Sequence, residues 1–268
     1  GGASGDMLLA ALLDAGLPLE ALQEELAKLP IGGYQLRVAR GQRAGLEGTN
    51  LRVELSDARP GSLPPSEQLQ AVEQSSLSSS VKEQATAVLQ RLIQAEERVH
   101  GASSPWHELG TLDTLVDVVG VVAGLERLGV QRVYASPLPT GSGTVTSAHG
   151  VLPVPAPVIL ELLALAEAPT LPPPLEPTGE LTTPTGAALI TTLASFHPPT
   201  MTVQRIGYGL GTRDTPGRPN ALALWLARVS EEASPLVLLE TNVDDMSPEL
   251  LAYAQEQLLA LGARDVWF

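Results

Sequence analysis

The stretch His107-Glu108-Leu109-Gly110-Thr111-Leu112-Asp113-Thr114-Leu115-Val116-Asp117 leads directly into an apolar run from Val118 to Leu125. This run is apolar on nearly all sides, which is typical of a buried helix and not of a surface helix. Asp113 is a favourable N-cap residue, and Gly129 is expected to end the helix. The sequence therefore predicts a buried helix that begins at or near Asp113, and the rest of the chain is interpreted around it.

Four side chains that can bind a divalent cation arrive at the start of this helix. Asp113 and Asp117 are four residues apart and share one helix face, and His107 and Glu108 come just before them. A carboxylate among apolar side chains is costly unless it is paired, and mixed nitrogen and oxygen donors suit a divalent metal. Alternatively, Asp113 only caps the helix and Asp117 only accepts bonds from backbone amides. Either acid alone favours that second interpretation, whereas the four residues together favour a metal site.

The composition narrows the class of protein. The formal net charge is -14 and there is no cysteine among the 268 residues. Strong negative charge argues against nucleic acid or an anionic membrane as a partner, and the lack of cysteine excludes thiolate ligands. No apolar stretch has the length of a membrane span, so we expect a cytoplasmic protein. The hydrophobic fraction of 44% is sufficient for a core built from Leu, Val and Ala.

Alternation of helical and strand patterns predicts an α+β fold in two domains. The larger N-terminal domain is expected at residues 1–229 and a linker at 230–235. The segment 236–268 restarts the pattern, with a strand from Leu236, a helix from Pro248 and a strand at Val266. We interpret this segment as the beginning of a second, incomplete α+β domain.

Three segments have the residues of an anion-binding loop. They are a glycine-rich turn with Ser4 and Gly5, a helix start with Thr185 and Gly186, and a glycine-rich loop from Arg205 to Asn220 with Arg213 and Arg218. Helix N-termini and arginines both bind phosphate or carboxylate groups. The alternatives are a tight turn at the first segment, capping by Thr183 or Thr185 at the second, and solvated loop charges or pairing with Asp214 at the third.

Several motifs in their joint order resemble one family over nearly the whole chain. They are Ser4-Gly5-Asp6-Met7, His107-Glu108-Leu109-Gly110 with Asp113 and Asp117, Ser136-Pro137-Leu138-Pro139, His149-Gly150-Val151-Leu152-Pro153, Thr183-Pro184-Thr185-Gly186, Gly207-Tyr208-Gly209, and Glu240-Thr241-Asn242 with Asp244-Asp245-Met246-Ser247-Pro248. The chain resembles the LarC family of nickel-insertion proteins, which act in the synthesis of the nickel-pincer nucleotide cofactor. It departs from that family in having no histidine-rich stretch at Ser56 to Ser66 and in having Pro105 where relatives tend to have a second histidine.

The resemblance implies a nickel chelatase of the lyase class. It would insert nickel into a pyridinium bisthiocarboxylic acid mononucleotide in a CTP-dependent reaction, with magnesium or manganese carrying the CTP. We assign the implied roles as follows: catalytic, Asp6, Glu108 and Asp117; metal ligands, His107, Glu108, Asp113, Asp117 and His149; binding of the mononucleotide, Ser4, Gly5, Thr185, Gly186, Arg213 and Arg218; nucleotide metal, Asp244 and Asp245. For Asp244 and Asp245, capping of the helix at Pro248 is the alternative.

Two other functions fit the same residues. One is a non-catalytic nickel carrier or scaffold, which the presence of only four histidines weakens. The other is a metal-dependent hydrolase of a phosphorylated small molecule, which would use the carboxylates and His107. The expected partner in every case is a small molecule, and a homo-oligomer is possible.

Overall fold

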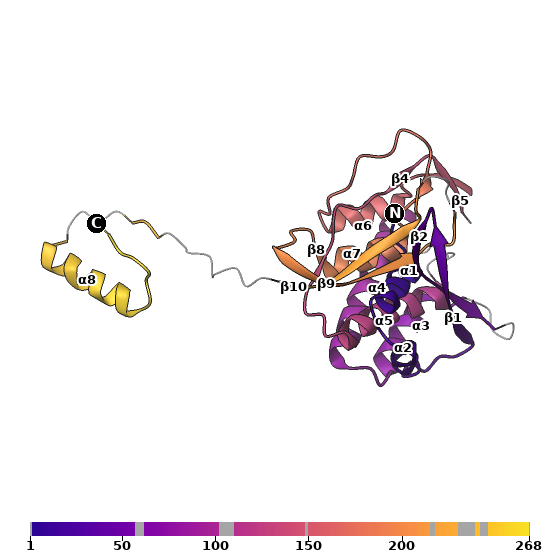
Figure 1. The fold of residues 1–268 in the computed structure, drawn as a ribbon, viewed down its shortest axis with the longest axis horizontal. Helices are drawn as coiled ribbons and strands as arrows, with labels where there is room; N and C mark the ends of the chain where they lie inside the picture. The colour runs from indigo at the N-terminus through magenta and orange to yellow at the C-terminus, as the bar shows by residue number, and fades with distance from the viewer. Residues whose placement is uncertain are drawn as a thin grey trace. The chain divides into compact units, whose positions relative to one another are not determined.

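The computed structural model describes residues 2–56, 62–101, 110–147, 150–214, 218–229, 239–241 and 246–267. Helices and strands are mixed along the chain, so the fold is α+β, as the sequence predicts. The chain divides into two compact units, Gly1–Ser230 and Glu231–Phe268. Each unit is described by itself below (Figure 1).

The first unit contains all the strands and all but one of the helices that the structure describes. In chain order they are α1 (Gly5–Asp14), α2 (Leu19–Leu26), β1 (Tyr34–Arg43), β2 (Leu46–Leu55), α3 (Pro65–Gln74), α4 (Ser79–His100), α5 (Leu112–Arg127), β3 (Val133–Tyr134), β4 (Gly141–Ser142), β5 (Thr144–Ser147), β6 (Gly150–Pro153), α6 (Pro157–Leu165), β7 (Gly179–Glu180), α7 (Pro184–Leu193), β8 (Ala194–Ser195), β9 (Met201–Leu210) and β10 (Ala221–Val229).

The main sheet has the strand order β1-β2-β9-β10. The pairs β1–β2 and β9–β10 are antiparallel hairpins, and β2 meets β9 in parallel at Thr49 and Gly209. Helix α1 packs on this sheet and contacts β2, β9 and β10 (Figure 1). The sheet therefore joins the first 55 residues to a hairpin that follows about 150 residues later.

Two glycines of β9 allow α1 to lie directly on the sheet. A methyl group on Gly209 would overlap the backbone oxygen of Met7, and one on Gly207 would overlap that of Ala11. The prediction that Arg205 to Asn220 is one glycine-rich loop is therefore wrong up to Leu210. These glycines serve close packing of a strand against a helix and not a turn.

Helix α5 is the buried helix that the apolar run predicts, and it ends before Gly129, whose φ is 69°. Its N-cap differs from the prediction, because the Thr111 side chain accepts a bond from the backbone N–H of Thr114 at 3.3 Å. Asp113 is consequently the second residue of the helix and not its cap. This frees the Asp113 carboxylate from the capping role that the sequence suggested for it.

An ion-pair network joins α2 to the C-terminal end of α5. The side chain of Glu25 is almost fully buried and accepts bonds from Lys28 Nζ at 2.8 Å and Arg127 Nε at 2.7 Å. Burial alone would raise the pKa of Glu25, but the bonds and charges of Lys28 and Arg127 outweigh it and lower the pKa below its usual value. Glu24 makes an exposed pair with the same arginine at 3.1 Å.

The second unit contains α8 (Pro248–Ala260), which confirms the helix predicted from Pro248. The Ser247 side chain caps it by accepting from Leu250 N–H at 3.4 Å. The predicted strand at Val266 is wrong, since residues 264–267 form no strand. Leu236 lies outside the described residues. Within the described ranges, no helix is long and apolar enough to cross a membrane.

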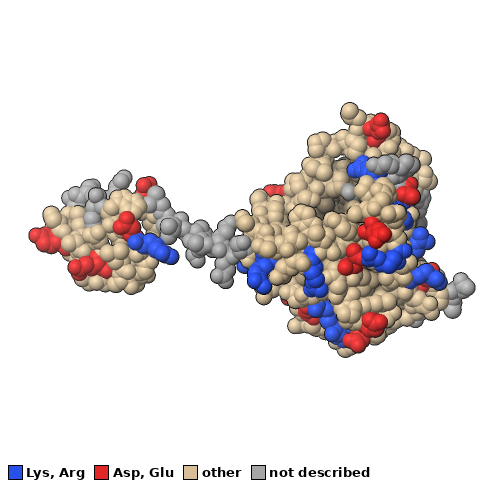
Figure 2. Space-filling view, in the orientation of Figure 1, with Lys and Arg blue, Asp and Glu red and all other residues tan. Residues whose placement is uncertain are grey.

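Acidic and basic side chains are interspersed on the face of the first unit that Figure 2 shows. One cross-strand pair of this unit joins Arg37 to Glu54 at 2.5 Å.

Candidate functional site: an acidic cluster between helix starts

The N-terminal segment is threaded between two parts of the chain that come much later. Ala3 N–H donates to Leu181 O at 3.0 Å, and Thr183 N–H donates to Ala3 O at 2.9 Å. This parallel bridge places the start of α1 beside the start of α7. Small residues are needed here because larger ones would not fit: a methyl group on Gly186 would overlap the backbone oxygen of Ala3.

Asp6 lies in the first turn of α1 and is held in place by its neighbours. Its Oδ1 accepts a bond from the Ser4 hydroxyl and another from Met7 N–H at 2.8 Å. Acidic residues are favourable in this turn, because the helix dipole and the unpaired amides stabilise negative charge. Asp6 therefore presents a fixed carboxylate at the start of α1.

Asp117 lies on α5 and points at that same turn. Its side chain is 5% exposed, and its Oδ1 has no hydrogen-bond partner among the described residues. The backbone N–H of Asp6 donates to its carboxylate. Burial first, and then the charges of Asp113 and Asp6, raise the pKa of Asp117 well above its usual value. A buried, half-paired carboxylate of this kind costs free energy unless a cation or a proton neutralises it.

Asp113 completes a set of three carboxylates. Partial desolvation and then the charge of Asp6 raise its pKa. Asp113 nevertheless keeps solvent access, so the rise matters less for it than for Asp117, whose carboxylate is enclosed. Three interacting acids, one enclosed and one open to solvent, favour the binding of a positive group at this point.

The start of α7 lies beside the start of α1. Thr183 accepts a bond from Gly186 N–H at 3.2 Å and so caps α7, as one of the two sequence interpretations states. Gly186 also lies against Ala3 and Ser4. The structure thus brings Ser4, Gly5 and Gly186 together, while their role in binding a mononucleotide stays a prediction.

The two predicted arginines, Arg213 and Arg218, differ in the contacts that the structure describes for them. Arg213 donates to the backbone oxygen of Glu180, in the short strand β7 just before Leu181. It is therefore tied to the segment that bridges to Ala3. Arg218 is half-buried and no described contact places it at the acidic cluster. A substrate role for both arginines stays a prediction.

Five of the predicted site residues lie outside the described ranges: His107, Glu108, His149, Asp244 and Asp245. Within the described ranges, no three His, Asp or Glu side chains are placed so that they could hold a metal ion by themselves. The three described acids would thus need further donors, from the substrate or from the rest of the chain, to complete a coordination shell.

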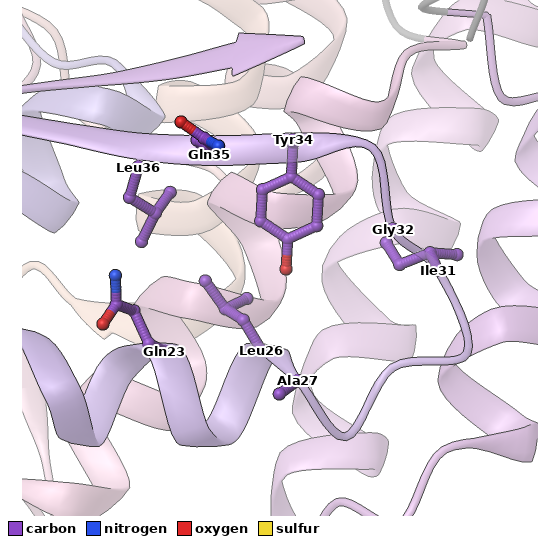
Figure 3. Close-up of a pocket in the computed structure, with 8 residues that line it drawn as sticks. All are labelled: Gln23, Leu26, Ala27, Ile31, Gly32, Tyr34, Gln35 and Leu36. Carbon is purple, nitrogen blue, oxygen red and sulfur yellow. The ribbon is translucent and has the colours of Figure 1, made fainter. Parts of the chain in front are cut away.

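A separate depression of about 520 Å³ lies between α2 and the start of β1 (Figure 3). It is lined by Leu26, Ile31, Tyr34 and Leu36 together with the amides Gln23 and Gln35. Its lining has no ionisable group apart from Tyr34, whose pKa is raised by burial. None of the predicted site residues contributes to it, and its lining offers no charged side chain to a metal ion or a phosphate.

Sequence reasoning missed the residues that hold the N-terminal segment. Thr182 is fully buried, and its hydroxyl donates to Pro139 O at 2.7 Å while its backbone bridges Ala3. The available signal was the run of small residues from Gly1 to Gly5, which indicates close approach of another chain segment. That run does not say which segment approaches.

The comparisons with known proteins agree with one another. A family model described as nickel insertion protein matches residues 1–268. Relatives provisionally named nickel insertion protein include one from Roseiflexus castenholzii, 46% identical over 99% of this chain and 68% of its own length. Others are from Thermomicrobium roseum, at 48% identity over 99% and 66%, and from Pelobacter propionicus, at 45% identity over 100% and 69%. No solved structure matches.

The chain spans about two thirds of the length of these relatives. The match nevertheless extends over essentially all of this chain and includes the segments that form the acidic cluster. The chain therefore belongs to the nickel insertion protein family.

Proposed function

We propose that this protein inserts nickel into a pyridinium bisthiocarboxylic acid mononucleotide in a CTP-dependent reaction that forms the nickel-pincer cofactor. Membership of the nickel insertion family supports the nickel part of this proposal. The sulfur-bearing nucleotide, the use of CTP with magnesium or manganese and the lyase class rest on the motif resemblance. A cytoplasmic location is proposed as the default for a sequence without a stretch of membrane-span length. Nickel is the inserted substrate, and the mononucleotide is the partner.

The observation on which the site rests is the enclosed carboxylate of Asp117 with its unpartnered Oδ1. Nickel is divalent and binds oxygen and nitrogen donors, and its positive charge would relieve the repulsion among Asp6, Asp113 and Asp117. A chain without cysteine cannot supply a thiolate, so anionic sulfur ligands would come from the substrate. The acids would hold nickel weakly enough to release it to a thiocarboxylate pair.

The residues around the cluster would orient the substrate. In the first turns of α1 and α7 the amides of Met7 and Gly186 already donate to Asp6 and Thr183, so a phosphate would be attracted mainly by the positive ends of the two helix dipoles. Three carboxylates beside them would repel that phosphate unless a divalent ion lies between them. The arrangement therefore favours ordered binding, with nickel before the mononucleotide.

The test is nickel transfer in a purified system. The protein is incubated with Ni²⁺, the bisthiocarboxylated mononucleotide, CTP and Mn²⁺, and the metallated nucleotide is followed by absorbance and by metal analysis after removal of protein. We expect the Asp117→Asn variant to lose transfer by about 100-fold and Glu24→Gln to retain it, because only the first removes a group at the cluster. A protein that binds nickel without forming the metallated nucleotide would be a carrier. A protein that releases phosphate from the mononucleotide without inserting nickel would be a hydrolase.

A further inference from the structure

Gly5 lies where the start of α1 touches the Asp117 side chain. A methyl group built on Gly5 would lie 2.5 Å from the Asp117 carboxylate carbon and 2.6 Å from its Cβ, and it would overlap Oδ2. Real Cβ atoms essentially never approach that closely. Any residue other than glycine at position 5 would therefore push the carboxylate away.

The backbone does not require glycine at this position. Gly5 is the first residue of α1 and is not among the glycines with positive φ, such as Gly16 and Gly129. Other residues could adopt this backbone conformation, so the glycine is explained by the space that Asp117 occupies.

The contact makes the two oxygens of Asp117 unequal. Oδ2 is enclosed by Gly5, and the backbone N–H of Asp6 donates to the carboxylate. Oδ1 is buried and has no partner among the described residues. The first turn of α1 therefore fixes the carboxylate in one orientation and leaves one oxygen available to a ligand.

We infer that Gly5 is a positioning residue, whose missing side chain lets α1 hold Asp117 so that Oδ1 is presented to the incoming nickel ion. The inference rests on the proposed function, and it assigns Gly5 a role toward the metal ion in place of a role in binding nucleotide phosphate. Residues that orient a ligand typically change metal affinity by about 10- to 100-fold when they are replaced.

The competing explanation is that Gly5 only permits close packing of α1 on α5. A matched control separates the two explanations, because Gly124 also allows the helices to pack. A methyl group on Gly124 would meet Leu17 Cδ2 at 3.0 Å and Leu12 Cδ1 at 3.1 Å, which are the ends of flexible side chains. Gly124→Ala therefore disturbs packing without touching Asp117.

The experiment is a double-mutant cycle read out by calorimetric titration with Ni²⁺ alone. We expect Gly5→Ala to weaken Ni²⁺ binding by about tenfold or more, and Gly124→Ala to change it less than about twofold. In the Asp117→Asn background, Gly5→Ala should produce no further loss, since it acts through the Asp117 carboxylate. Circular dichroism and melting temperature establish that each variant is folded.

The outcomes test the metal site at Asp117 and the positioning role of Gly5 separately. If Asp117→Asn binds Ni²⁺ like the unaltered protein, the site in the proposed function is overturned. If Asp117→Asn is weak but Gly5→Ala is not, or if their losses add, only the positioning role is overturned. Should Gly5→Ala fail to fold, the double variant Gly5→Ala with Asp117→Gly removes every atom that the methyl group overlaps, and recovery of the fold supports the contact whereas continued unfolding contradicts it.

Discussion

At the scale of single residues, the most consequential side chain is Asp117. Its carboxylate is enclosed near two other acids and lacks a partner for one oxygen. Proteins ordinarily satisfy such groups, and an exception points to a ligand or to catalysis. The free energy that Asp117 costs the unliganded protein should therefore be measurable.

Replacing Asp117 with Asn should stabilise the unliganded protein by about 1–2 kcal/mol at neutral pH, because it removes a charge that burial and repulsion disfavour. The direction of this stability change follows from the raised pKa of Asp117, because the folded state binds the proton more tightly than the unfolded state does. The protein therefore loses stability as pH rises from 3.8 through the folded pKa. Urea unfolding of both proteins at several pH values would check this prediction. The difference in free energy of unfolding between the Asn variant and the parent should vanish at acidic pH. An Asn variant less stable than the parent at pH 7 would contradict the role of buried charge.

Glu25, which pairs with Arg127 at the C-terminal end of α5, gives the opposite pH dependence. Glu25 has a lowered pKa, so it contributes stability above 4.5 that is lost as pH falls through its folded pKa. We expect Glu25→Gln to destabilise the protein by about 1–2 kcal/mol at pH 7 and by much less in acid, because two cations lose their buried partner.

The control for this prediction is Glu24→Gln, which removes the exposed partner of the same Arg127. Exposed pairs contribute about 0–1 kcal/mol, so this variant should unfold at nearly the parent denaturant concentration. Equal effects of the two substitutions would show that burial of Glu25 has no part in its contribution.

At the scale of elements, the contact of α1 with β9 depends on two glycines. Gly209→Ala should destabilise the first unit by about 3 kcal/mol or more, because its methyl group would overlap the backbone of Met7, which cannot rotate away. Gly41→Ala, whose methyl group would meet Leu210 Cδ1 at 3.4 Å, is an ordinary contact in the same sheet and serves as the control. Thermal unfolding of both variants tests the difference, and a tolerated Gly209→Ala would contradict the close packing.

Some helices and strands could be predicted from the sequence and others could not. Helix α5 was predictable because an all-apolar helix has a pattern of its own, although its cap was assigned to Asp113 when Thr111 provides it. Strand β9 was missed because its glycines exist for α1, and no local pattern reveals a partner that lies about 200 residues earlier. Burial of Asp117 was predictable from its apolar neighbours, whereas the contact with Gly5 depends on the tertiary fold.

At the scale of the whole chain, the two units differ in how much they bury. The first contains the hydrophobic core, whereas none of the α8 residues is buried. Because stability follows the apolar area removed from water, the core of the first unit should not need the second. A chain ending at residue 230 is therefore expected to melt within about 2 °C of the 268-residue chain in scanning calorimetry. A large drop in melting temperature would show that residues 231–268 stabilise the first unit.

The path of the main sheet has a consequence for synthesis on the ribosome. Strand β2 and helix α1 leave the exit tunnel early, yet their partner β9 begins only at Met201. At a typical elongation rate the nascent chain must wait on the order of ten seconds for that partner, with the face of α1 that packs on β9 uncovered. The main sheet is therefore completed only after β10 has been synthesised, and a chaperone bound to the nascent N-terminal helix would protect it during this interval.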